Sequence, residues 1–203
     1  MEWLTISGDP AAWRAVGLTA TDDGTIPLFG TSLRITPGDE SAGIIAWTMS
    51  GIGDPPSTID GLVTESADPQ PPVFAAHALG AIAIDHVVVM TPDLERTSSG
   101  IAAAAGCELK RIREVGEMRQ GFHRIGRGGL IVELVERPEI EEGPARFWGL
   151  VLIVDALDEV CRQMGDDLIG APRDAVQPGR RIATVRDAAR LGLPVALMTP
   201  EAR

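Results

Sequence analysis

The sequence predicts an α+β fold in which tandem βαβββ modules form a curled mixed sheet around a cavity. Two observations predict this fold. The order of one strand, one helix and three strands occurs twice, and matching positions in the two copies are equally spaced. His86 lies 47 residues before Glu133, and Gly149 lies 47 residues before Ala196. Two copies of one structural unit explain this agreement.

The first copy covers residues 81–137. Its opening strand is the Val-rich run Ile84–Met90 (IDHVVVM), and the alanine-rich stretch that follows predicts a helix ending near Gly106. A Pro-Asp pair between the two is typical of a turn that starts a helix. The remaining strands are expected at 107–115, 121–128 and 130–136, where the residues alternate around glycine turns.

The second copy covers residues 147–200. Gly149–Val154 (GLVLIV) predicts its first strand, and DALDEVCRQMG predicts a short helix. Two further strands are expected at Arg181–Val185 and Pro194–Met198. The two modules together predict a domain over residues 81–203.

The region before this domain is less regular. Residues 1–52 predict an additional, degenerate βαβββ-like unit, and residues 53–80 predict a linker or arm because Pro, Asp, Gly and Ser are frequent there. In the N-terminal unit a helix is expected at 9–16, with strands at 3–6, 18–21, 26–28, 32–35 and 42–49.

The runs IDHVVVMTPDLERT and GGLIVELVE resemble the first module of the vicinal oxygen chelate superfamily, which includes glyoxalases, bleomycin resistance proteins and dioxygenases. The resemblance covers about residues 82–200. It implies a cup that holds one divalent metal, with ligands at His86, Glu133, Gly149 and Ala196. Glycine and alanine have no side chain that can bind a metal, so the resemblance implies a degenerate metal site.

His86 and Glu133 are therefore the candidate catalytic residues, as an acid–base pair. They are also candidate metal ligands, with His123 as a third, for Zn, Ni, Mn or Fe. The favoured expectation is that no cofactor is bound. For His123, a surface position beside Arg124 is the favoured alternative.

An apolar cavity lining is expected where alternate strand residues share a face with His86. The candidate ligand-binding residues are Val88, Met90, Ile131, Val151, Ile153 and Met198. Arginines on the same strands have two interpretations: they bind an anionic group, or they face solvent and pair with acids. The second is preferred for Arg111, Arg113, Arg119, Arg124, Arg180, Arg181 and Arg186.

Composition limits the classes of partner. The chain has 203 residues, a net charge of −11 and two cysteines far apart in sequence. An acidic chain disfavours binding to nucleic acid or to anionic membranes. Unpaired cysteines and the lack of a long apolar run predict a cytoplasmic protein.

Three functions are consistent with these features. The first is binding of a small molecule in the cavity between the modules, without the usual four-ligand metal site. The second is a lyase, isomerase or hydrolase that acts on a small oxygenated substrate, through a metal or through His86 and Glu133. The third is assembly, because an odd N-terminal unit without a partner in the chain favours a homodimer.

Overall fold

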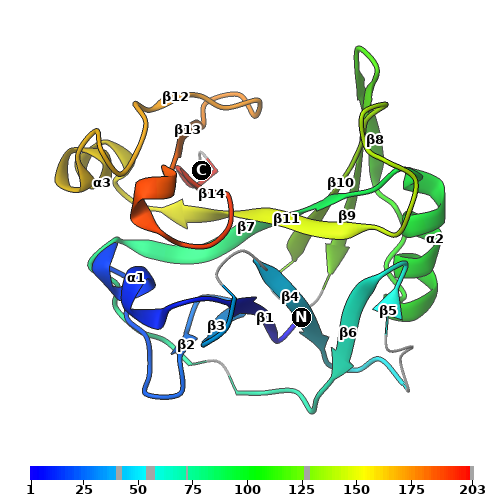
Figure 1. Ribbon diagram of the computed structural model, residues 1–203, viewed down its shortest axis with the longest axis horizontal. Helices are drawn as coiled ribbons and strands as arrows, with labels where there is room; N and C mark the ends of the chain where they lie inside the picture. The colour runs from blue at the N-terminus through cyan, green and yellow to red at the C-terminus, as the bar shows by residue number, and fades with distance from the viewer. Residues whose placement is uncertain (40–42, 54–57, 72, 126–128, 202–203) are drawn as a thin grey trace.

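The computed structural model describes residues 1–39, 43–53, 58–71, 73–125 and 129–201. Its strands form two mixed sheets that lie one above the other (Figure 1). The N-terminal sheet has the strand order β2-β3-β1-β4-β6-β5, and the eight-stranded sheet has the order β12-β13-β14-β11-β7-β10-β9-β8. The fold is therefore α+β, as predicted.

The first half of the eight-stranded sheet is one βαβββ module. It consists of β7 (Ala81–Met90), α2 (Leu94–Ala105), β8 (Arg111–Val115), β9 (Met118–Ile125) and β10 (Leu130–Glu136). The module closes when β10 pairs in parallel with β7.

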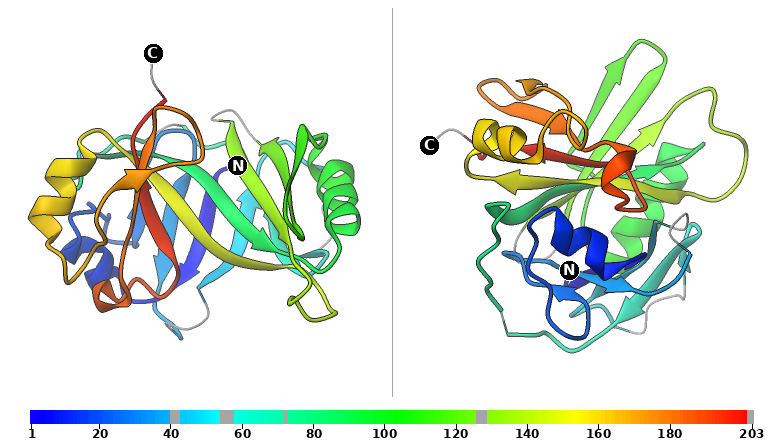
Figure 2. Two further views of the ribbon diagram at one scale, coloured as in Figure 1. Left: turned by 90° about the horizontal axis from the view of Figure 1, so that it is seen from above. Right: turned by 60° about the vertical axis from the view of Figure 1, so that its left-hand side comes forward.

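The second half repeats this arrangement with shorter strands. It consists of β11 (Arg146–Val154), α3 (Leu157–Met164), β12 (Arg173–Asp174), β13 (Arg181–Thr184) and β14 (Val195–Met198). A short 3-10 helix, η2 (Asp187–Ala189), precedes β14. Strand β14 pairs in parallel with β11, and β11 joins the halves by pairing antiparallel with β7. The tandem modules are confirmed, but the sheet is open between β12 and β8 and is not strongly curled (Figure 2).

The two helices differ at their first residues. The Asp93 side chain accepts a hydrogen bond from the backbone N–H of Arg96, and Gly106 ends α2 with a left-handed φ of 63°. Both are common signals at helix ends. Helix α3 begins after Ala156, which has no side-chain oxygen to cap it.

The N-terminal sheet is more complete than the sequence predicted. Strand β1 pairs in parallel with β3 and antiparallel with β4, and β4 pairs in parallel with β6. The pattern matches that of the eight-stranded sheet, with a shortened second unit that lacks a helix in its described residues. The elements of this sheet are β1 (Trp3–Ser7), α1 (Pro10–Ala15), β2 (Thr25–Ile26), β3 (Ser32–Thr36), β4 (Ile44–Met49), β5 (Thr58–Ile59) and β6 (Leu62–Ser66).

Strands β5 and β6 lie inside the stretch for which the sequence predicts a linker. Ile59 and Leu62 are buried, and they flank a tight turn in which Asp60 and Gly61 both have positive φ. The prediction of a linker over 53–80 is therefore wrong for 58–66. Turn residues dominate this stretch so strongly that they hide two short strands. Residues 18–21, predicted as a strand, are also not one.

The odd N-terminal unit thus finds its partner within the chain. The reason given for a homodimer does not hold, since β1 pairs with β4 instead of with a second copy. A dimer stays a prediction without that support.

One hydrophobic core joins the two sheets. It includes Leu4 and Trp47 of the N-terminal sheet and Val87 and Leu150 of the eight-stranded sheet. The Trp47 and Phe147 rings meet edge to face, with centroids 5.2 Å apart. The N-terminal sheet therefore covers one face of the eight-stranded sheet. We call the opposite face, on which the His86 side chain lies, the cup face. Among the described residues, no helix is long and apolar enough to cross a membrane.

Candidate functional site

Strand register places the four positions implied by the resemblance on the cup face. Directly paired residues point to the same face of a sheet, and residues two apart on a strand do so too. His86 pairs with Val151, which in turn pairs with Ala196. Val88, two residues after His86, pairs with both Glu133 and Gly149. The sequence-based alignment of the modules is therefore correct at each of these positions.

A β-bulge brings a further carboxylate to His86. The pairing of β7 with β11 steps from His86–Val151 to Ile84–Leu152, which leaves Asp85 without a paired residue on β11. Such a bulge turns neighbouring side chains toward one side of the sheet. The Nδ1 atom of His86 consequently lies 2.7 Å from Oδ2 of Asp85. Regular alternation predicts opposite faces for these two residues, so sequence reasoning missed Asp85.

Arg180 completes the buried part of the site. Its Nη2 lies 2.7 Å from Oδ1 of Asp85, and both side chains are at most 6% exposed. Its Nε donates to the backbone oxygen of Thr199 at 2.8 Å. Burial by itself raises the pKa of Asp85, but the hydrogen bond and charge of His86, with those of Arg180, outweigh it and leave this pKa lowered. Asp85 is therefore an anion held between two basic groups.

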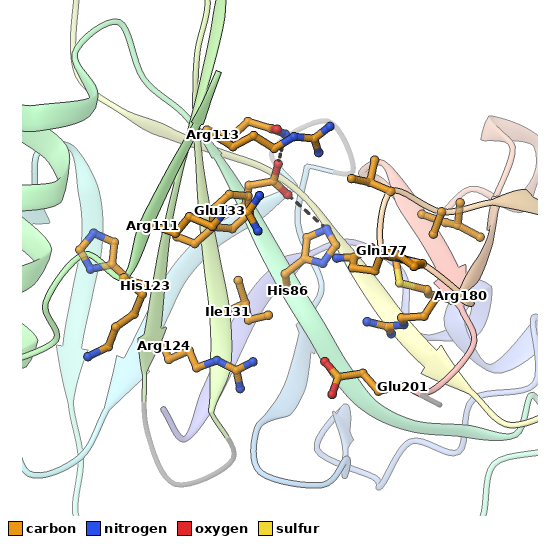
Figure 3. Close-up of a pocket in the computed structure, with 18 of the residues that line it drawn as sticks. His86, Arg111, Arg113, His123, Arg124, Ile131, Glu133, Gln177, Arg180 and Glu201 are labelled. Carbon is orange, nitrogen blue, oxygen red and sulfur yellow. Dashed lines mark hydrogen bonds and ion pairs between the residues drawn. The ribbon is translucent and has the colours of Figure 1, made fainter. Parts of the chain in front are cut away.

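On the other side of the imidazole lies Glu133. Its Oε2 is 3.4 Å from Nε2 of His86, and its Oε1 accepts a hydrogen bond from Gln120 (Figure 3). The predicted His–Glu pair is thus brought together. The Gln120 amide oxygen is buried and has no hydrogen-bond partner within the described part of the chain.

A cavity of about 500 Å³ opens above His86 and Glu133. Of the six predicted lining residues, Ile131 and Met198 border it. The other four lie on the cup face but outside the cavity, because it is displaced toward β8, β9 and the segment 173–178. These four are Val88, Met90, Val151 and Ile153. Alternation identified the face correctly but could not locate the cavity along it.

Three arginines form one wall of this cavity. Arg111 and Arg113 of β8 pair with cup-face residues of β9, and Arg124 of β9 pairs with Ile131. All three border the cavity, and within the described residues none forms an ion pair with a carboxylate. We call Arg111, Arg113 and Arg124 the arginine wall. For these side chains the preferred prediction, pairing with acids on the outer side, is wrong.

That interpretation does hold for other arginines. Arg119 lies among acids, 3.3 Å from Glu136 and also paired with Glu95. Arg181 pairs with Asp158 of α3 at Oδ2, 2.5 Å away.

His123 lies on the other face of β9. It pairs with Val132, its Nδ1 is 2.7 Å from the Cys107 carbonyl oxygen, and its Nε2 is 3.0 Å from Ser98 Oγ of α2. Its side chain is fully buried, and burial lowers its pKa. The ring points away from Glu133 in Figure 3. His123 is thus neither a third ligand beside His86 nor the surface residue that was the alternative.

The four-ligand metal site implied by the resemblance does not fit this chain. Ala196 offers no donor atom, and a Cβ at Gly149 would lie 2.4 Å from the Pro194 carbonyl oxygen, so no ligand side chain could stand there. His86 lies between two carboxylates that face different nitrogens of its ring, so the three do not converge on one point. Within the described residues no group of three or more His, Cys, Asp or Glu is placed to hold a metal.

Solved structures share this architecture. Methylmalonyl-CoA epimerase from Mycobacterium tuberculosis matches with a TM-score of 0.53 and 15% identity, over 64% of this chain and 94% of that one. A mutant of 4-hydroxymandelate synthase from Streptomyces coelicolor matches over 100% of this chain and 93% of that one, with a TM-score of 0.63 and 15% identity. No family model matches the sequence, and no curated protein matches it.

The chain therefore has the vicinal oxygen chelate fold that its sequence resembles. The second match covers the whole chain, so the N-terminal sheet belongs to the shared architecture. At 15% identity these matches show the fold alone, and function has to be derived from the site.

Proposed function

We propose that this protein binds a small molecule in the cavity on the cup face, without the four-ligand metal site. The observation that carries the proposal is the cavity of about 500 Å³, which is lined by apolar side chains on its floor and by convergent polar and charged groups. Ligand sites in proteins typically measure about 300–1,000 Å³ and combine these two features. Ile131, Ile182 and Met198 supply the floor.

The His86–Glu133 pair supplies the polar anchor. A neutral imidazole carries one N–H, and the carboxylate of Asp85 favours its position on Nδ1. Nε2 then presents a lone pair toward the carboxylate of Glu133. Two acceptors that face each other are satisfied by a shared proton or by a hydroxyl or N–H group of a ligand. The pair therefore offers an acceptor to a hydroxyl or N–H group of a ligand near the apolar floor, but a shared proton satisfies it without one.

Hexanoate is a suitable first probe, with calorimetric titration as the measurement. Ile182→Trp fills the floor of the cavity and should abolish binding. Ile112→Trp introduces the same side chain on β8, at a position outside the cavity lining, and should bind as the wild type does. Equal binding by both variants, or no binding by the wild type at millimolar probe, would contradict the proposal.

A second candidate function is acid–base catalysis on a small oxygenated substrate. The specific observation that favours it is the chain Asp85–His86–Glu133, in which the 2.7 Å contact fixes the orientation of the imidazole. Orientation of a base by a third group is a recurring feature of proton-transfer sites. His86 or Glu133 would take a proton from the substrate, and Asp85 would act as a positioning residue.

Proton exchange tests this candidate directly. Small 2-oxo and 2-hydroxy acids are incubated with the protein in D₂O, and loss of their C–H signals is followed by NMR. Exchange that is present in the wild type and lost in both His86→Gln and Glu133→Gln would support catalysis. Exchange at the same rate in wild type and variants would refute it.

A further inference from the structure

We infer that the ligand is an amphipathic organic anion, whose phosphate or carboxylate group contacts the arginine wall while its apolar part lies on the cavity floor. This inference rests on the proposed binding function and specifies the class of ligand.

The arginine wall is a concentration of positive charge in an acidic protein. The chain has 29 acidic and 18 basic residues, yet Arg111, Arg113 and Arg124 have no carboxylate partner in the described residues. Lys110 borders the same cavity. Like charges on neighbouring strands repel each other. A bound anion would remove this repulsion and accept the planar, forked hydrogen bonds of the guanidinium groups.

The carboxylates of the cavity do not neutralise the wall. Glu133 is engaged by Gln120 and faces His86. Glu201 also borders the cavity, but within the described residues it forms no ion pair with Arg111, Arg113 or Arg124. The cationic groups are therefore left for a ligand.

Apolar side chains also border the cavity. Ile131 lies on the floor, and Phe122 borders the cavity beside Arg111, with which it pairs. Opposite them, the segment 175–178 presents Val176, which is 69% exposed, and Pro178. A ligand with a charged end and a hydrocarbon body matches both surfaces, whereas an inorganic anion matches only one.

Two other anionic ligands are disfavoured. A nucleic acid would be repelled by the net charge of −11 and would not enter a cavity of about 500 Å³. A free inorganic ion would leave the apolar floor exposed to water.

Calorimetric titrations of the full chain with four probes separate the contribution of the ligand's charged group to binding from that of its apolar part. Hexyl phosphate and hexanoate carry both features, with phosphate and carboxylate as the two sources of charge. Hexanol carries only the apolar part, and inorganic phosphate only the charge. We expect the stronger of the two amphipathic anions to bind at least about ten-fold tighter than hexanol or inorganic phosphate, since one charge-assisted hydrogen bond contributes a factor of about ten or more.

The matched variants remove three charges each. Arg111→Gln/Arg113→Gln/Arg124→Gln should weaken binding of the preferred anion about ten-fold and leave hexanol binding unchanged. The control Arg137→Gln/Arg146→Gln/Arg186→Gln removes exposed arginines that do not border the cavity and should change the affinity less than about two-fold.

The outcomes distinguish this inference from the proposed function. If hexanol binds as tightly as both anions, and Ile182→Trp abolishes that binding, the cavity binds ligands but the anion inference is wrong. Equal weakening by both triple variants also overturns the anion inference, because the loss of affinity would then follow from the change in net charge and not from the arginine wall. Binding of no probe overturns the inference together with the proposed function.

Discussion

The two modules of the eight-stranded sheet differ in where they carry polar side chains. The first module, β7 to β10, places His86, Glu133 and the arginine wall on the cup face. At the matching positions the second module has Gly149 and Ala196. The same strand order thus supports polar side chains at these positions of one module and small residues at the matching positions of the other.

This difference shows that a repeated unit can keep its topology while its chemistry diverges. The second module requires a small residue at Gly149, the position that matches His86 of the first module, because β11 approaches Pro194 closely there. The second half contributes Arg180 to the buried charged groups around His86. Arg180 lies just before β13, and its side chain forms an ion pair with Asp85 of the first half. The halves are therefore linked by an ion pair as well as by the β7–β11 pairing.

The largest expected effect comes from breaking that link. Arg180→Met leaves the Asp85 carboxylate buried without its guanidinium partner, and we expect a loss of about 3–5 kcal/mol in the free energy of unfolding. Chemical denaturation measures it. The neighbouring change Arg181→Met breaks an exposed pair with Asp158 and should cost less than about 1 kcal/mol.

The effect of Arg180→Met also depends on pH in a defined direction. The pKa of Asp85 is lowered in the folded state, so its stabilising contribution is present above the carboxyl's ordinary pKa and is lost as pH falls through the folded value. The difference between wild type and variant should therefore shrink in acid. A difference that is constant from neutral to acid pH, or equal losses in the two methionine variants, would contradict a buried ion pair.

An intermediate effect is expected where the second module lacks its polar residue. In Gly149→Ala the new Cβ would lie 2.4 Å from the Pro194 carbonyl oxygen, which is backbone and cannot rotate away. We expect a loss of about 1–3 kcal/mol on denaturation. Gly53→Ala is the control, because a Cβ at Gly53 would meet no atom of the described residues within 4 Å and the φ of this residue is not positive. Similar stability of the two variants would show that a side chain fits at Gly149.

The smallest effects concern the helices of the two modules. Asp93→Ala removes the cap of α2 and should lower the unfolding free energy by about 1 kcal/mol. Ala156→Ser adds a capping hydroxyl to α3, at an exposed position, and should raise it by about 0.5 kcal/mol. Thermal denaturation distinguishes the expected loss of stability in Asp93→Ala from the expected gain in Ala156→Ser. A loss of stability in both variants would mean that capping does not distinguish the helices.

Much of the eight-stranded sheet could be predicted because its signals are local. Equal offsets revealed the two modules, and Gly106 marked the end of α2. Period-two alternation grouped His86 with Val88 and Glu133 with Ile131, and the family resemblance implied that both faces point into the cup, as the pairing of β7 with β10 shows. In contrast, β5 and β6 were missed, because their two-residue and five-residue spans lie among turn-forming residues.

The sequence by itself determined the module repeat through residue type and spacing, and the family resemblance that it carries implied the cup face and the two missing ligand side chains. Tertiary structure decided what surrounds His86. The bulge at Asp85 depends on the pairing of β7 with β11, and the contact with Arg180 joins residues 95 positions apart. The location of the cavity and the unpaired state of the arginine wall within the described residues likewise depend on how strands distant in sequence pack, which no local pattern encodes.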